Sequence, residues 1–181
     1  MEYTNKVRFI SWFIIAAIVI GVVSWYLFMP VIVTDPNDYY ELSISRKFTF
    51  TEKNVDEKDT WELLMHEEDK DIFLYGYVFK KEEKAFKEIA IEDKTNYIEK
   101  MEAKILTDIE IFKIKNNYES YKYTISFINK NQEREYYSTT YLINTENKDV
   151  FYIIELICDI KDKDKYKADF DKITETFKEL K

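Results

Sequence analysis

The sequence contains very little glycine, proline, cysteine or histidine: its 181 residues include two, two, one and one of these. With Cys158 as the single cysteine, no intramolecular disulfide can form. With Gly21 and Gly76 as the two glycines, a glycine-rich phosphate-binding loop is excluded. His66 lies in MHEEDKD, which lacks the second histidine of a zinc-binding H-E-x-x-H pair, so we expect a surface or strand-end histidine. The sequence therefore predicts no catalytic residue, no metal and no cofactor.

Charge is plentiful but evenly mixed. The chain carries 27 Lys and Arg against 35 Asp and Glu, a formal net charge of −8. This balance repels nucleic-acid phosphates, so no nucleic-acid partner is predicted. The densest acidic clusters are Glu67, Glu68, Asp69 and Asp71, and Asp159, Asp162 and Asp164. The second cluster lacks the glycine and the terminal glutamate of an EF-hand, so turn formation and helix capping are expected for it.

One long run is free of charge. Residues 9–29 read FISWFIIAAIVIGVVSWYLFM, without an acidic or basic side chain. As a helix this run would be about 31 Å long, the thickness of the hydrocarbon core of a bilayer. Trp12 lies near one end and Trp25 and Tyr26 near the other, where amphipathic rings favour the headgroup boundary. The sequence therefore predicts a single transmembrane helix at residues 9–29.

The flanking charges give this helix a direction. Lys6 and Arg8 precede it, whereas no Lys or Arg follows until Arg46. The positive-inside rule then places residues 1–8 in the cytoplasm and the rest of the chain on the extracytoplasmic side of the plasma membrane. A cleaved signal peptide is the alternative, but its apolar run is usually shorter and would be followed by an A-x-A-like site. We therefore favour an uncleaved signal anchor.

The remainder is predicted to form a linker, residues 30–41, and one domain, residues 42–181. Apolar and alternating runs predict strands at 41–51, 61–66, 72–80, 109–115, 118–129, 134–145 and 150–159. Helical spacing predicts one helix at 91–105 and a second that begins at Asp162 or Asp164 and runs to Leu180. The order β-β-β-α-β-β-β-β-α predicts an α+β fold, an α/β/α sandwich with a mainly antiparallel sheet and one helix on each face.

The predicted domain, residues 42–181, resembles a known family, most clearly at its C-terminal end. An aromatic strand, VFYIIELICDI, is followed by a charged turn, KDKDKY, and by an amphipathic helix, YKADFDKITETFKEL, with Thr176 and Phe177 near its end. This pattern resembles the PsbP-like fold family, of which the chain would be a membrane-anchored bacterial member. The resemblance implies an α/β/α sandwich and mostly non-enzymatic work, as extrinsic subunits of membrane complexes or as docking modules.

Tyrosine is abundant, with 15 residues. Tyrosine suits interfaces because it combines a large apolar area with a hydrogen-bonding tip. The candidate binding-surface residues are Tyr121, Tyr123, Tyr136, Tyr137 and Tyr141. The alternative is that they pack in the core and on the sheet.

These observations predict a single-pass, membrane-anchored, non-enzymatic protein-binding or adaptor domain on the extracytoplasmic side. Its partners would be the lipid bilayer, through the N-terminal helix, and another envelope or secreted protein. Two alternatives remain open: an immunity protein against a secreted toxin, and an envelope sensor of a small ligand bound between sheet and helix. A carboxylate-based hydrolase would require two carboxylates about 5–10 Å apart in one cleft.

Overall fold

The protein has an α+β fold built on antiparallel sheets. The computed structural model describes residues 14–25, 29–53, 60–81 and 83–180. Its elements after the N-terminal helical segment are β1 (Val31–Thr34), β2 (Tyr40–Ile44), β3 (Thr49–Lys53), β4 (Thr60–Glu67), β5 (Lys70–Lys80), α2 (Phe86–Met101), β6 (Lys104–Ile111), β7 (Glu119–Asn129), β8 (Arg134–Asn144), β9 (Val150–Asp159), the 3₁₀ turn η1 (Ile160–Asp162), α3 (Lys163–Glu175) and β10 (Lys178–Glu179).

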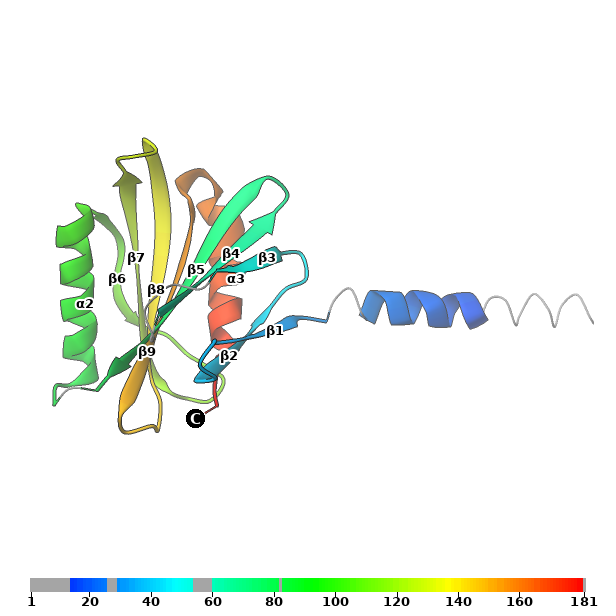
Figure 1. Cartoon of the computed structure of the whole chain (residues 1–181), viewed down its shortest axis with the longest axis horizontal. Coiled ribbons are helices and arrows are strands. Elements are labelled where there is room, and N and C mark those ends of the chain that lie inside the picture. The colour runs from blue at the N-terminus through cyan, green and yellow to red at the C-terminus, as the bar shows by residue number, and fades with distance from the viewer. Residues whose placement is uncertain (1–13, 26–28, 54–59, 82, 181) are drawn as a thin grey trace, which may run out of the picture.

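The strands form two sheets (Figure 1). The larger has the order β3-β4-β5-β9-β8-β7-β6, and each neighbouring pair is antiparallel. Strand β9 is the last of these in the chain, yet it lies at the centre, between β5 and β8. It therefore joins the two meanders β3–β5 and β6–β8 into one sheet. The smaller sheet has the order β1-β2-β10.

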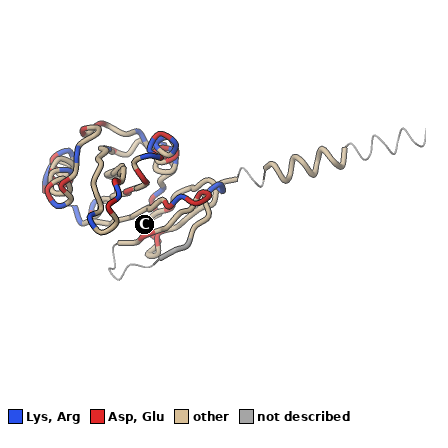
Figure 2. Tube along the Cα trace, turned by 90° about the horizontal axis from the view of Figure 1, so that it is seen from above, with Lys and Arg blue, Asp and Glu red and all other residues tan. Residues whose placement is uncertain are grey.

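The two helices pack on opposite faces of the large sheet, and Figure 2 views them end-on, on either side of the strands. Alternation along β9 shows the two faces, because successive side chains of a strand point to opposite sides. Tyr152, Ile154 and Leu156 belong to the core beneath α3, which the small sheet also covers. Phe151 and Ile153 belong to the core beneath α2. The structure thus has one helix on each face, as the sequence predicts.

Several predicted elements agree with the observed ones. The expected strands at 61–66, 72–80, 118–129, 134–145 and 150–159 correspond to β4, β5, β7, β8 and β9 within two residues at each end. Their repeating pattern is strong because each has at least one buried face, so the alternation of apolar side chains is regular.

The N-terminal part of the domain differs from the prediction. The expected strand at 41–51 is two strands, β2 and β3, which belong to different sheets. A turn separates them, in which the N–H of Phe48 donates to the carbonyl of Ser45 (3.1 Å). The predicted linker at 30–41 contains β1, which pairs with β2 from Val31 onward. The folded domain therefore begins close to the end of the N-terminal helical segment.

Both helices have shifted ends. The helix expected at 91–105 is α2, which ends at Met101 because Glu102 adopts a left-handed conformation (φ 52°). Strand β6 then occupies 104–111, so the strand expected at 109–115 lies earlier in the chain. The helix expected to reach Leu180 ends at Glu175, and β10 follows. Its apolar stripe continues past the helix end because Phe177 packs in the same core as Phe170.

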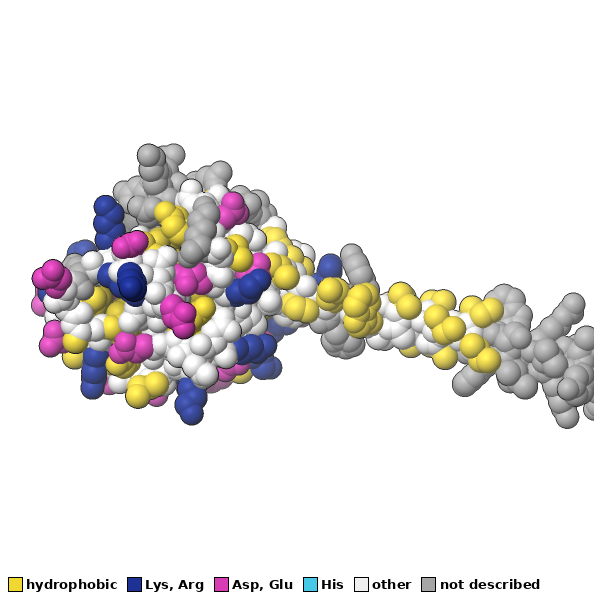
Figure 3. All heavy atoms as spheres, turned by 90° about the horizontal axis from the view of Figure 1, so that it is seen from below, with side chains coloured by type: hydrophobic (Ala, Val, Ile, Leu, Met, Phe, Trp, Pro, Cys, Tyr) yellow, Lys and Arg dark blue, Asp and Glu magenta, His cyan; other side chains and the backbone are white. Residues whose placement is uncertain are grey.

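The N-terminal helical segment projects away from the domain (Figures 1 and 3). Residues 14–25 are helical, and their apolar side chains are exposed, for example Ile18 (60%) and Ile20 (65%). In the described part of the chain, no helix is both long and apolar enough to cross a membrane. The transmembrane helix predicted at 9–29 includes residues 9–13 and 26–28, which lie outside the described residues.

A glycine in β5 lets the two sheets meet. Gly76 faces the core beneath α3, where the indole Nε1 of Trp61 donates a hydrogen bond to the hydroxyl of Tyr40 (2.7 Å). All three residues lie at the contact of β2 with β4 and β5. A Cβ atom at Gly76 would overlap both the Tyr40 hydroxyl and the Trp61 ring. The small sheet can therefore approach the large one only where β5 has no side chain.

We predict that Gly76→Ala destabilises the domain by about 3 kcal/mol, because the added methyl group forces Tyr40 and Trp61 apart in a packed core. The measurement is the free energy of unfolding of the full chain in detergent, followed by near-ultraviolet circular dichroism. Gly21→Ala is the matched control, since a Cβ there has no atom within 4 Å. Equal stability of the two variants would contradict the packing role of Gly76.

Candidate functional site

A ladder of aromatic rings runs along one face of β5. Phe73, Tyr75, Tyr77 and Phe79 occupy alternate positions, so they all point to the α2 side of the sheet. Their neighbouring rings are stacked, with centroids 6.4, 6.4 and 6.1 Å apart. The first three are half-buried and Phe79 is 43% exposed. This face of β5 is therefore partly open to solvent.

Helix α2 forms the opposite wall. Asp93, Tyr97 and Met101 recur every four residues, so they share one side of the helix. The buried residues Phe86 and Ala90 fix the helix to the sheet, where the Phe86 ring meets that of Phe151 edge-on (5.7 Å). The helix packs mainly on β6 and β7, which leaves a space between it and β5.

That space holds connected cavities. One of about 280 Å³ and one of about 390 Å³ share Tyr77, Tyr97, Met101 and Glu155 among their lining residues, and a third of about 200 Å³ adjoins the first at Asp93. We call this space the aromatic groove. Its principal residues are Phe73, Tyr75, Tyr77 and Phe79 of β5, Asp93, Tyr97, Lys100 and Met101 of α2, Tyr136 and Thr140 of β8, and Ile153 and Glu155 of β9.

Glu155 is a buried carboxylate on the floor of the groove. It lies on the central strand, directly opposite Tyr75 on one side and Thr140 on the other, and is 3% exposed. Its Oε1 accepts hydrogen bonds from the hydroxyls of Tyr97 (2.6 Å) and Ser138 (2.7 Å). Burial raises the pKa of Glu155, and these two hydrogen bonds act in the opposite direction.

Asp93 is the second carboxylate of the groove. Its Oδ2 accepts a hydrogen bond from the hydroxyl of Tyr123 (2.7 Å). Burial raises the pKa of Asp93, while that hydrogen bond and the charge of Lys100 act to lower it. The negative charge of Asp93 in turn contributes to the raised pKa of Glu155, so the two carboxylates are electrostatically coupled. The groove thus combines an aromatic wall with two acidic groups.

Neither carboxylate was singled out by the sequence analysis. Two signals in the sequence point to the groove in retrospect. The run IFLYGYVFK has an aromatic residue at every second position, and Glu155 is the one charge inside the apolar run VFYIIELIC. Asp93 gives no comparable signal, because acidic residues are common along α2.

The five tyrosines predicted as a binding surface are divided between the two faces. Tyr123 and Tyr136 are buried on the α2 side, and Tyr121 is partly buried against the same core. Tyr137 and Tyr141 are buried beneath α3. Alternation along β7 and β8 causes this division, so the five do not form one exposed surface. Tyr136 lines the aromatic groove.

The predicted membrane-interface and topology residues lie at the N-terminus. Trp25 is 67% exposed on the helical segment. Lys6, Arg8, Trp12 and Tyr26 lie outside the described residues. Cys158, in contrast, is fully buried beneath α3, and burial raises the pKa of its thiol to about 12.

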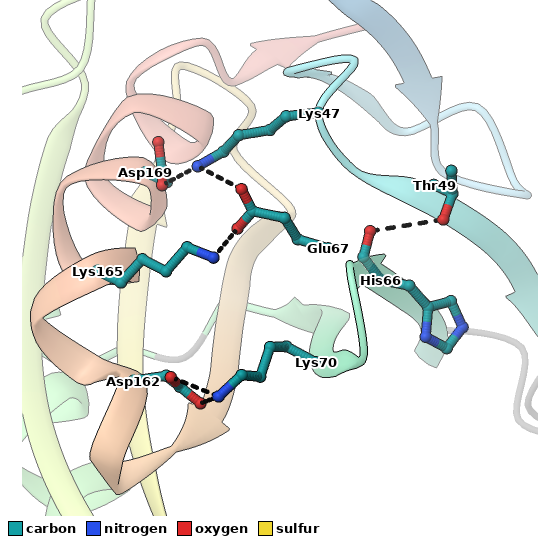
Figure 4. Close-up of polar contacts among 8 residues, drawn as sticks. All are labelled: Lys47, Thr49, His66, Glu67, Lys70, Asp162, Lys165 and Asp169. Atoms are coloured by element: carbon teal, nitrogen blue, oxygen red, sulfur yellow. Dashed lines mark hydrogen bonds and ion pairs between the residues drawn. The ribbon is translucent and has the colours of Figure 1, made fainter.

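The acidic clusters form ion pairs that fix α3 (Figure 4). Glu67 lies between Lys47 (3.7 Å) and Lys165 (3.0 Å), and Lys47 also contacts Asp169 (2.6 Å). Lys70 pairs with Asp162 (2.8 Å), which holds the β4–β5 hairpin to the start of the helix.

Asp159 and Asp71 have local partners. Asp159 accepts a hydrogen bond from the N–H of Lys161 at the start of η1, as capping predicts. Asp162 occupies the N-cap position of α3 but makes no side-chain cap bond. His66 lies at the end of β4, with its Nδ1 3.0 Å from Oδ1 of Asp71. These contacts fit a structural role for the clusters.

Known structures share this fold. No protein-family model matches the sequence, and no curated protein matches it. The fold is similar to that of the cyanobacterial PsbP protein CyanoP of Synechocystis sp. PCC 6803 (TM-score 0.54, 11% identity, 84% of this chain and 93% of that one). It is also similar to the fold of the Ran-binding protein Mog1p of Saccharomyces cerevisiae (TM-score 0.58, 11% identity, 84% of this chain and 96% of that one). A third similar structure is that of LpqN of Mycobacterium tuberculosis, which is involved in cell envelope biogenesis (TM-score 0.56, 5% identity, 83% of this chain and 90% of that one).

The fold is therefore PsbP/Mog1-like, in agreement with the resemblance seen in the sequence. At these identities the similarity establishes the architecture, and the function has to be argued from the chain's own residues.

The raised pKa of Glu155 makes a prediction about stability. The carboxyl of Glu155 binds a proton more tightly in the folded state than in the unfolded chain. Its contribution to the unfolding free energy is therefore full below its ordinary pKa of 4.5, and it is lost as the pH rises through the pKa of the folded state. The difference in unfolding free energy between wild type and Glu155→Gln should therefore fall as the pH rises from about 4.5. Chemical denaturation at several pH values measures it.

Glu67→Gln is the control with the opposite sign. Burial would raise the pKa of Glu67, but the contact with the ammonium group of Lys165 (3.0 Å) and the charge of Lys47 outweigh it, and the pKa is lowered. The contribution of Glu67 to the unfolding free energy is present above its ordinary pKa of 4.5, and it is lost as the pH falls through its pKa in the folded state. The two variants should thus diverge from wild type in opposite pH ranges. Parallel profiles would contradict the assignment of a raised pKa to Glu155.

Proposed function

We propose that this protein is a membrane-anchored, non-enzymatic binding domain on the extracytoplasmic side, and that the aromatic groove is its binding site. The groove is the observation that carries the proposal. Ligand sites are typically concave and mostly apolar, with a few convergent polar groups, and the groove combines half-buried rings with the polar atoms of Glu155, Asp93 and Tyr97.

Three observations support the membrane anchor. The N-terminal helical segment exposes apolar side chains on all sides, which is favourable in lipid and unfavourable in water. The flanking charges of the sequence favour a cytoplasmic N-terminus. The segment is also tied to the domain, because Nε of Arg46 donates to the carbonyl of Met29 (2.9 Å) and β1 begins at Val31.

A protein partner from the envelope or a secreted protein is the first candidate occupant. Mog1p, which has the same fold, is described as Ran-binding, and LpqN as involved in cell envelope biogenesis. The connected cavities also favour the second candidate, a sensor of a small ligand held between sheet and helix. Among the described residues, no contact favours the immunity-protein alternative over these two.

Photo-crosslinking tests the protein-partner candidate. We expect p-benzoylphenylalanine in place of Phe79, in the groove, to crosslink a discrete protein in native membranes. The control is the same residue in place of Ile128, which is 60% exposed and follows the groove residue Phe127 on β7, so it points to the other face. Equal crosslinking from both positions, or none from Phe79, would exclude a protein in the groove.

The topology has its own test. Cys158 is buried, so Lys148→Cys provides an exposed thiol on the domain, and Glu2→Cys introduces a thiol into the segment that precedes the apolar run. A membrane-impermeant maleimide applied to intact cells should label Lys148→Cys and leave both Glu2→Cys and the unmodified chain unlabelled. Labelling of Glu2→Cys in place of Lys148→Cys would reverse the proposed orientation.

A further inference from the structure

We infer that the aromatic groove binds a small organic cation, with an ammonium group between Glu155 and Asp93 and an apolar body against the rings of β5. The inference rests on the groove being a binding site, as proposed above, and adds the chemical class of the ligand. It does not depend on the membrane anchor.

The charges of the groove favour a cation. Glu155 and Asp93 line the same cavity of about 280 Å³, and the charge of Asp93 contributes to the raised pKa of Glu155. Two acidic groups that line one mostly apolar cavity repel each other when both are ionised, and burial adds to that cost. An ammonium group between them would relieve both penalties. The net charge of −8 also attracts cations to the domain.

The aromatic wall favours an organic cation over a metal ion. A ligand cation placed over a tyrosine or phenylalanine ring within about 6 Å gains cation–π energy. Tyr75 lies directly across the strand pair from Glu155, and Tyr77 and Tyr97 line the same cavities as that carboxylate. In contrast, the described residues hold no group of three or more metal-ligating side chains.

The size of the groove favours a small molecule. Cavities of about 280 and 390 Å³ that share four lining residues match the space taken up by small ligands. Glu155 is 3% exposed, so a ligand has to enter the cavity to reach it, and contact with the surface is insufficient. A compact molecule with its charge at one end satisfies this requirement.

Lys100 gives the inference a distinctive consequence. This exposed side chain lines the first cavity, and its charge lowers the pKa of Asp93. Lys100 therefore competes with a bound cation for the same carboxylate. Its replacement by glutamine should strengthen cation binding, an effect that a loss of folding cannot produce.

The test compares three probes of one shape by isothermal titration calorimetry, on the full chain in a non-ionic detergent. We expect phenethylammonium to bind at least tenfold more tightly than the neutral 2-phenylethanol, and the anion phenylacetate to bind weakest. Glu155→Gln and Asp93→Asn should each weaken phenethylammonium about tenfold and leave 2-phenylethanol unchanged, whereas Lys100→Gln should tighten phenethylammonium.

Asp171→Asn is the matched control. Asp171 accepts a hydrogen bond from a tyrosine hydroxyl, that of Tyr141 (2.8 Å), as Asp93 does from Tyr123, but it lies on α3 at the opposite face. Its replacement should leave phenethylammonium binding unchanged. An equal loss in Asp171→Asn and Asp93→Asn would show that the effect is a general one of charge, and would overturn the inference.

The pH dependence of the wild type tests the same site without substitution. Binding should tighten, with release of protons, as the pH rises through the raised pKa values of Glu155 and Asp93. The ionisable groups that face these two carboxylates, or the tyrosines beside them, are Tyr97 and Lys100 on α2, Tyr75 and Tyr77 on β5, Glu62 on β4, Tyr123 on β7 and Tyr136 on β8. A flat pH profile between 4 and 8, roughly the range over which buried carboxyls titrate, would count against the inference.

Two outcomes separate this inference from the proposed function. Phenethylammonium binding without a crosslink from position 79 would support a small-ligand site and would exclude a protein partner in the groove. A crosslink from Phe79 with equal affinity for phenethylammonium and 2-phenylethanol would support the protein partner and overturn the cation site.

Discussion

The width of the large sheet determines what the rest of the molecule must do. Seven strands spaced about 4.8 Å apart span roughly 29 Å, whereas a helix is about 10 Å across. One face is covered jointly by α3 and the small sheet, and the small sheet meets β5 at Gly76. The other face has α2, which packs mainly on β6 and β7. The rings of β5 are left beside an open groove because one helix cannot cover the whole face.

Strand β9 explains why a carboxylate lies in that groove. Its alternate residues serve two cores, and Glu155 replaces an apolar residue in the series that faces α2. Burial of a charged group is costly, and Tyr97 and Ser138 offset part of the cost through hydrogen bonds to one oxygen. A cation bound beside Glu155, as inferred above, would offset the rest of that cost.

The sequence predicted those features that depend on local pattern. Strand alternation located β7, β8 and β9, and the stripe of Tyr166, Phe170 and Ile173 located α3. Features that depend on pairing between distant segments were missed: the split of 41–51 between two sheets, β1 in the predicted linker, and the pairing of β9 with β5. The groove belongs to this second group, because Asp93 and Glu155 are 62 positions apart and meet only when α2 packs on the sheet.

The positions of the N-terminal helical segment and the groove are compatible with the proposed function. The helical segment enters the domain at β1, in the small sheet that packs on the α3 side, whereas the groove lies on the opposite face under α2. In Figure 1, α2 lies at the end of the domain farthest from the helical segment. With the segment in a bilayer as proposed, the groove faces the aqueous phase, away from the lipid surface. A small cation could then reach Glu155 from solution, while the ion pairs of Glu67 and Lys70 keep the opposite face closed around α3.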